Sequence, residues 1–407
     1  MEIPRHTVSL LFCFVLGVAA PDPLAAPRTI TLEEALRLAE ASPALPAITL
    51  EVDRATAEVG ASGLWPNPVV SVSREEAAGT VDRFANLSVP LPLTRRTALE
   101  KDAARSGLDA AKARSELAHA GLRLRVREMF AGLVEQQRRH ETLTTGLSDL
   151  TALVEILRAR EAEGESSGFD RMRAERERAD LEADLFHARA GLAKARISLA
   201  SLVGIAAEDL TVDGTLERPA AFPGRDEMTK LLASRGDIVA LDADAQRADT
   251  QARAARRRGV PEPVFTLGAK TTETDGESGT GAVAGIAFDV PLFDRGQGSL
   301  AVARADGALL RARREALTRE AEGEALAAFA EAEARRAAED AYAATGDAED
   351  LIRIAKAAYE AGEMRILDLL DAYRTALATR LKTIELKADA RRAEAALNRV
   401  LGTEVVR

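Results

Sequence analysis

The stretch "GVPEPVFTLG" (Gly259–Gly268) decides the fold, because a similar stretch, "LWPNPVVSVS" (Leu64–Ser73), lies 195 residues before it. Further landmarks recur in the same order at nearly the same distance, from 198 to 201 residues: "SVPLPL" (Ser88–Leu93) and "DVPLFD" (Asp289–Asp294), "LASLVG" (Leu199–Gly204) and "LNRVLG" (Leu397–Gly402), and Gly164 and Gly362. A constant period of this kind indicates an internal duplication. The chain of 407 residues therefore reads as two tandem repeats.

The repeats are expected at residues 27–211 and 228–407, with a linker at 212–227 between them. Each repeat begins with a helical segment, Leu32–Leu64 or Met228–Gly259. The first of these opens on Thr31 and Glu34, the spacing of a capping box. A Pro-x-Pro boundary and two short strand-like runs follow in each repeat.

These runs predict β-hairpins at residues 67–92 and 262–292. Val70 and Val72 alternate with serines, and a period of two with one apolar face indicates a half-buried strand. Each run has roughly 9–11 residues, the length that a tilted strand needs to cross a bilayer. Periodicity alone leaves two interpretations open, a membrane-spanning strand pair and a surface hairpin of a soluble domain.

Long helices are expected after each hairpin, because no proline lies between Pro92 and Pro219 or after Pro291. About 70 residues separate each hairpin from Gly164 or Gly362, and a continuous helix of that length would reach roughly 100 Å. Apolar residues recur in steps of four and three, as in a coiled-coil seam, at Leu143, Leu147, Leu150, Val154 and Leu157. The glycines are expected to end the helices, with turns near 164–168 and 362–366 and a returning helix after each.

Composition and the absence of certain motifs limit the classes of function that the sequence predicts. The net charge of −10 comes from interspersed acids and bases, with no basic stripe for nucleic acid. We find no nucleophile elbow, phosphate-binding loop or metal-ligand cluster, and the three histidines beyond the first 26 residues are isolated, so no enzyme, metal site or cofactor is predicted. Aromatic residues make up only 4% of the chain, which suits thin helix–helix seams better than a thick globular core.

The first 26 residues are interpreted as a secretory signal. A short start with one arginine precedes the apolar run Val8–Ala20, which is too short to span a bilayer. Cleavage is expected between Ala20 and Ala26, which would remove Cys13, the only cysteine. A lipoprotein cysteine is the alternative, but the small residues that normally precede one are missing. No other segment has 18 consecutive apolar residues, so any membrane part would consist of strands.

The stretch "YEAGEMRILDLLDA" (Tyr359–Ala372) adds a family resemblance. Together with the duplicated hairpins, it resembles the TolC-like outer-membrane efflux proteins, whose tip motif is matched by Tyr359, Gly362, Asp368, Leu370, Asp371 and Ala372. The resemblance implies a mainly α fold with a β membrane part. In a homotrimer, four strands per protomer would form a shared 12-stranded outer-membrane β-barrel, and long antiparallel helical hairpins would form a periplasmic α-barrel.

The resemblance also implies a function. Such proteins are exit ducts of tripartite efflux pumps or type I export systems in the Gram-negative outer membrane. They dock to a periplasmic adaptor (membrane fusion) protein and an inner-membrane transporter, for example of the RND type. The "WPNP" start and the short end after Gly402 resemble the channels of heavy-metal and cation systems. Organic solutes remain an alternative cargo.

The candidate gate is the tip of the second repeat. Asp368 and Asp371 are three residues apart and would share one helix face, so that a trimer would form a ring of carboxylates. Tyr359 stands at the family's tyrosine position, whereas Met364 occupies its arginine position and Arg365 follows one residue later. Simple solvation or capping of a helix N-terminus is the alternative role for these aspartates.

In the first repeat, Gly164 and Asp170 match Gly362 and Asp368, but Glu161 replaces the tyrosine and Arg173 the second aspartate. The competing interpretation of the whole chain is a periplasmic adaptor or a coiled-coil spacer without a membrane part. An adaptor would carry one helical hairpin flanked by β-rich domains.

Overall fold

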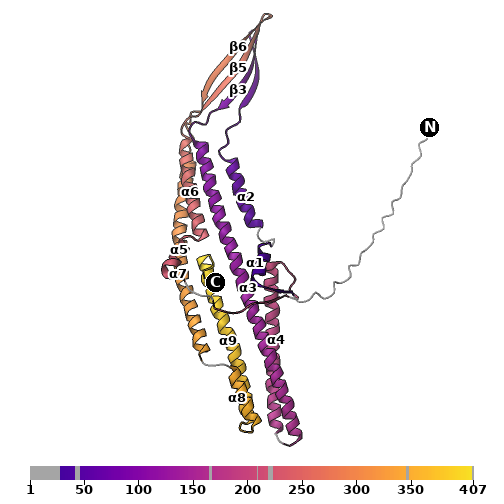
Figure 1. Cartoon of the computed structure of the whole chain (residues 1–407). Coiled ribbons are helices and arrows are strands. Elements are labelled where there is room, and N and C mark those ends of the chain that lie inside the picture. Colours follow the sequence, from indigo (N-terminus) through magenta and orange to yellow (C-terminus); the bar gives the residue numbers. More distant parts are fainter. Residues whose placement is uncertain are drawn as a thin grey trace, which may run out of the picture.

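The computed structural model describes residues 28–41, 46–164, 167–208, 210–218, 223–344 and 348–405. The predicted signal at 1–26, with Cys13, lies outside these residues. The molecule is a long rod with a narrow β-sheet at one end and the turns of two helical hairpins at the other (Figure 1). None of the described helices combines the length and hydrophobicity needed to cross a membrane.

The sheet has four antiparallel strands in the order β2-β3-β5-β6. Their bounds are β2 (Val69–Ala77), β3 (Thr80–Pro90), β5 (Pro263–Thr274) and β6 (Glu277–Phe288), within the two predicted hairpins. Ala78-Gly79 and Asp275-Gly276 join the strands, and all four residues have positive φ. Two-residue turns of this type match the twist of paired strands.

Strand register separates an apolar face from a polar one. Val70, Leu87, Leu267 and Ala284 lie side by side across all four strands. The apolar face defined by this row is open, since Val70 is 74% and Leu267 52% exposed. The opposite face carries hydrogen bonds such as Ser88 Oγ to Thr266 Oγ1 (2.9 Å) and the ion pair of Lys270 with Asp82 (2.8 Å), among other polar contacts.

The helices confirm the predicted arms in the first repeat and correct the prediction in the second. Helix α3 (Arg96–Ala162) is continuous over 67 residues and returns through α4 (Gly168–Val203). The second arm is not one helix but two, α7 (Gln297–Ala343) and α8 (Ala348–Glu360), before α9 (Ile366–Leu401). The sequence between α7 and α8 reads Thr-Gly-Asp, residue types that disfavour a helix interior.

The two expected leading segments are also divided. The first contains α1 (Leu32–Glu40) and α2 (Pro46–Ala61). The second corresponds to α5 (Arg225–Ala233) and α6 (Gly236–Arg257), and α5 begins three residues before the expected segment, within the predicted linker. The predicted cap is present, because Thr31 Oγ1 accepts a hydrogen bond from the backbone N–H of Glu34 at 3.3 Å.

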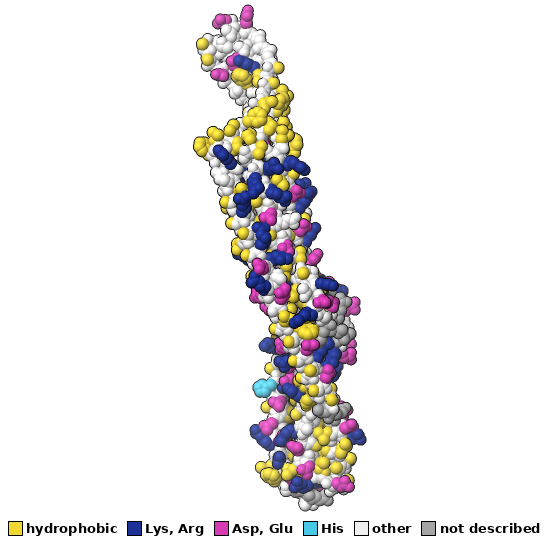
Figure 2. Space-filling view, turned by 90° about the vertical axis from the view of Figure 1, so that its left-hand side faces the viewer, with side chains coloured by type: hydrophobic (Ala, Val, Ile, Leu, Met, Phe, Trp, Pro, Cys, Tyr) yellow, Lys and Arg dark blue, Asp and Glu magenta, His cyan; other side chains and the backbone are white. Residues whose placement is uncertain are grey.

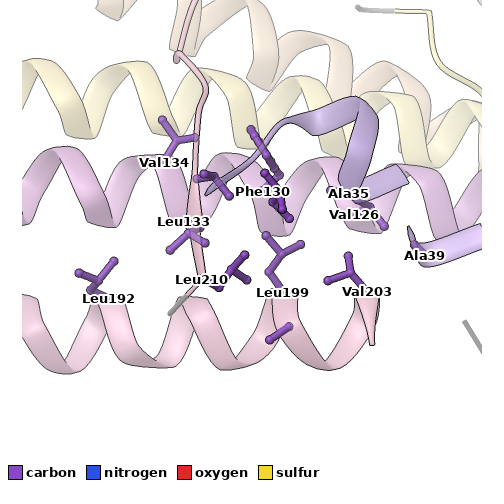
Figure 3. Packing of buried hydrophobic residues seen from close by; sticks show 13 residues of the cluster. Ala35, Ala39, Val126, Phe130, Leu133, Val134, Leu192, Leu199, Val203 and Leu210 are labelled. Atoms are coloured by element: carbon purple, nitrogen blue, oxygen red, sulfur yellow. The ribbon is translucent and has the colours of Figure 1, made fainter. Parts of the chain in front are cut away.

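A parallel pair of three-residue strands was not predicted. β1 (Arg28–Ile30) pairs with β4 (Leu210–Val212), which ties the start of the first repeat to its end. The side chain of Gln137 on α3 exchanges two hydrogen bonds with the backbone of Val212. Ile30 and Leu210 are buried there in a core between α3 and α4 (Figure 3), with Val126, Phe130, Leu133, Leu199 and Val203.

Candidate functional site

The candidate site is the end of the molecule where both helical hairpins turn. Gly164 follows α3 and Gly362 follows α8, and both have φ of +78°, a left-handed conformation that glycine adopts at little cost. Each glycine N–H bonds the carbonyl three residues earlier, that of Glu161 or Tyr359, at 3.0 Å. The two turns therefore lie at the predicted glycines and have matching geometry.

One hydrophobic core holds the two tips together. It contains buried side chains from both hairpins: Leu143, Leu150, Leu153, Val154 and Leu157 of α3, Ala174, Leu181, Leu185 and Ala188 of α4, Ala355 of α8, and Leu369 and Leu370 of α9. The predicted seam on α3 is thus confirmed, and it packs against the second repeat as well as against α4. A movement of one tip away from the other would have to open this core.

Tyr359 ties the second tip to the first. Its hydroxyl accepts a hydrogen bond from Nη1 of Arg160 at 3.0 Å, and Cζ of Arg160 lies 4.9 Å from the centre of its ring. Cations at that distance are attracted to the ring face. The contact joins α8 to the last turn of α3.

Arg365 does not take part in this contact. Its side chain is 81% exposed, and its ion pair among the described residues is with Asp368 of its own helix, with Nε 3.3 Å from Oδ2. Met364, at the family's arginine position, is partly buried against the shared core. The departure from the family pattern therefore replaces a polar side chain at that position with an apolar core contact.

Asp368 and Asp371 both lie exposed on the first two turns of α9. The backbone N–H of Asp368 bonds the carbonyl of Arg365 at 3.1 Å. Their three-residue spacing places the two carboxylates on one side of the helix, as predicted. Within a single protomer they face solvent, close to the positive end of the α9 dipole.

Asp170 has a local partner instead. Ser167 caps α4, accepting from the backbone N–H of Asp170 at 3.3 Å and donating its hydroxyl to Oδ2 of Asp170 at 2.8 Å. In the same turn Arg171 bonds Glu161 and Glu175. These bonds raise the pKa of Arg171, and the bond from Arg171 lowers the pKa of Glu175. Unlike Arg160, these side chains of the first tip thus pair locally.

Sequence reasoning missed Arg160 and Tyr373. Tyr373 is half-buried among both hairpins, and burial, followed by the charges of Asp149 and Glu360, raises its pKa. Arg374, the next residue, forms an ion pair with Glu177 of α4. The repeat aligns Glu161 with Tyr359, but an alignment of repeats does not say that the two tips touch.

Within the described ranges, no three His, Cys, Asp or Glu side chains are grouped closely enough to hold a metal ion.

Known proteins match this chain over most of its length. A model of the family described as outer membrane efflux protein matches residues 228–403. The cobalt-zinc-cadmium resistance protein CzcC of Cupriavidus metallidurans is 30% identical over 379 residues, which cover 92% of this chain and 90% of that protein.

Solved structures share the fold. One is CusC, whose structures are described in terms of conformational changes that accompany folding and transmembrane channel formation. Its TM-score is 0.73 at 19% identity, and the match covers 95% of this chain and 96% of the CusC chain. The open state of the MtrE outer membrane channel of Neisseria gonorrhoeae has a TM-score of 0.71 at 20% identity, covering 91% of this chain and 89% of its own. Two hairpins, each preceded by a strand pair, also differ from the single hairpin expected of an adaptor. With a relative at 30% identity along nearly its whole length, this chain belongs to the outer membrane efflux protein family.

Proposed function

We propose that this outer membrane efflux protein works as a homotrimer and forms the exit duct of a tripartite pump. The observation that carries the proposal is the polarity of the protomer. One end is a sheet with an exposed apolar face, and the other end consists of two helical hairpins packed by a shared core. A sheet apolar on one side and polar on the other suits a wall between lipid and water.

In this proposal the sheet crosses the outer membrane and the hairpins extend into the periplasm. There the tips would meet a periplasmic adaptor and an inner-membrane transporter, for example of the RND type. Residues 1–26 would direct export and then be removed. The two edge strands β2 and β6 have no partner on their outer sides in the described protomer, and neighbouring copies would pair with them.

The proposed gate is formed by Asp368 and Asp371. Three-fold symmetry would bring six carboxylates to the periplasmic opening, where they would attract cations and repel anions. Arg160 and Tyr359 would hold the opening narrow by tying the two tips of each protomer. Asp170, whose carboxylate already accepts a hydrogen bond from the capping residue Ser167, would stabilise the start of α4 rather than line the gate.

The proposed cargo is divalent metal cations. The argument rests on the relative named for cobalt, zinc and cadmium resistance and on the cation-attracting tip. Ions would pass along the carboxylates without a fixed coordination site, and selection would lie in the partner proteins.

Planar-bilayer recordings test the gate. We expect Asp368→Ala with Asp371→Ala to lower selectivity for cations and to weaken block by multivalent cations, because the negative ring is removed. Asp170→Ala is the matched control, since that carboxylate has the equivalent position in the first tip but a local partner. A double variant with the selectivity and block of the parent would exclude the carboxylates as the gate.

A further inference from the structure

An apolar groove lies where the sheet meets the helices. It has a volume of about 670 Å³, and its lining includes Leu93, Arg95, Arg257, Val260, Phe265 and Ile286. Phe265 and Ile286 are register partners on β5 and β6. They lie on the same side of the sheet as Leu267 and Ala284, so the groove continues the apolar face.

Two arginines stand at the helical end of this groove. Arg95 precedes α3, Arg257 is the last residue of α6, and both are exposed. Neither forms an ion pair with another residue that the structure describes. Arg96, by contrast, is paired with Glu100 and Glu262 at 3.0 and 3.4 Å. The groove therefore joins an apolar wall to two arginines that form no ion pair within the described part of the chain.

The surrounding surface has the same division. Figure 2 shows hydrophobic side chains gathered where the sheet narrows onto the helices, and Lys and Arg side chains gathered directly beside them on the helical part. The apolar residues exposed in this zone include Leu64, Trp65, Leu93, Val290, Leu292 and Phe293, the last 90% exposed.

We propose that the groove binds an anionic phospholipid of the inner leaflet of the outer membrane. Its phosphate would lie between Arg95 and Arg257, and one acyl chain would run along Phe265, Ile286 and Phe288 on the apolar face. The assignment rests on the proposed function, because that orientation places the sheet in the membrane and the arginines on its periplasmic side.

The dimensions agree with this placement. β5 has 12 residues, which at about 3.3 Å each and a tilt of about 45° span roughly 28 Å, close to the hydrocarbon thickness of a bilayer. The arginines, beyond the periplasmic end of the strand, then lie at headgroup depth. Basic residues there attract anionic headgroups, and a small free anion would not need the apolar wall.

Native mass spectrometry of the full-length protein in mild detergent tests the proposal. The delipidated protein is titrated with phosphatidylglycerol or with phosphatidylcholine of the same acyl chains. We expect phosphatidylglycerol to be retained about 30-fold more strongly, since two arginines contribute about 1 kcal/mol each. Arg95→Gln with Arg257→Gln should reduce this retention to the level of phosphatidylcholine.

Arg125→Gln with Arg313→Gln is the matched control, because both arginines are exposed, lie far along the helices from the sheet and form no ion pair in the described part of the chain. Arg95→Lys with Arg257→Lys should keep the preference and shows that charge, not packing, is responsible. Equal retention of both lipids by the parent, or an unchanged preference in the glutamine variant, would overturn the proposal. A parent that conducts in bilayers without preferring either lipid would disprove only the lipid site, whereas a parent that never enters membranes would disprove the duct.

Discussion

The contact between Arg160 and Tyr359 is the smallest feature whose loss should change channel behaviour. Tyr359→Phe removes the hydroxyl that accepts the hydrogen bond but keeps the ring under the guanidinium. The lost bond is worth about 0.5 to 1.5 kcal/mol, enough to raise the population of a loosened tip several-fold. We therefore expect a higher mean conductance in planar bilayers, and a larger increase for Arg160→Ala, which removes both interactions.

Tyr373→Phe is the control for this prediction. It deletes a hydroxyl from the same core without touching Arg160. If Tyr359→Phe and Tyr373→Phe shift conductance equally, the effect belongs to the core in general and the tie has no special role.

At single residues, the sequence predicted the turns of the hairpins but not the contacts between them. Gly164 and Gly362 were placed correctly, because a left-handed turn leaves a local signature. Arg160 left none. It lies 199 residues from Tyr359, and the packing of both hairpins around a shared core brings the tips together. The tip motif also did not predict that Met364 would pack against the shared core while Arg365 stayed in solvent.

Among the elements, the helices and strands whose apolar residues recur at a regular spacing were predicted from the sequence. The short strands that depend on pairing with a distant segment were not. Strand alternation and the spacing of leucines on α3 extend over many residues. β1 and β4 have three residues each and exist through pairing with each other and through Gln137. Helix α7 ends at Ala343 although no proline follows it, so the absence of prolines did not predict this end.

A buried ion cluster joins α7 to α9. The carboxylate of Glu394, only 4% exposed, contacts Arg336 at 2.5 Å and Arg391 at 2.8 Å. Burial lowers the pKa of Arg391, because a charged guanidinium is disfavoured away from water. Glu394→Ala would leave two guanidinium groups without this counter-charge, and we expect a loss of about 3–5 kcal/mol, seen as a much lower melting temperature in detergent.

Glu315→Ala is the comparison, because its pair with Arg319 is largely exposed and should contribute little. Similar melting temperatures for the two variants would show that the buried cluster does not stabilise the helix pair.

The junction of α5 and α6 should make stability depend on pH. Burial raises the pKa of Asp237, but hydrogen bonds from Arg235 and the backbone outweigh it, so the net pKa is lowered. Both side-chain bonds are 2.8 Å long, and Arg235 also bonds the carbonyl of Val400. A lowered folded-state pKa contributes stability above the unfolded-state value of about 3.9 and loses it as the pH falls through the folded-state value.

Asp237→Asn should therefore melt at a lower temperature than the parent at pH 7, by an amount corresponding to about 1 to 2 kcal/mol. The difference should shrink as the pH falls below about 4. Thermal melts of both proteins over a pH series measure this. A difference that stays constant with pH would mean that the asparagine disturbs packing rather than removing a charge.

At the scale of the whole molecule, the sheet leaves two strand edges unpaired within the described chain. The edges belong to different strands, β2 and β6, and therefore differ from each other. Contacts between unlike edges repeat around a rotation axis and close into a ring when the angle allows. The apolar face would then point outward all the way round, and the open edges would disappear.

Cysteine cross-linking tests this closure. Val72→Cys on β2 is combined in turn with Ser278→Cys, Thr280→Cys, Ala282→Cys and Ala284→Cys on β6. Within one protomer β3 and β5 separate these strands by about 14 Å, beyond the reach of a disulfide, whose Cα atoms lie within about 7 Å. Oxidation in membranes should therefore yield covalent dimers and trimers for at least one combination. Leu87→Cys with Leu267→Cys, on adjacent strands, should give only monomers on a denaturing gel. Monomers alone from every β2–β6 combination would mean that these edges do not meet, and a ring of three protomers closed through the sheet would be wrong.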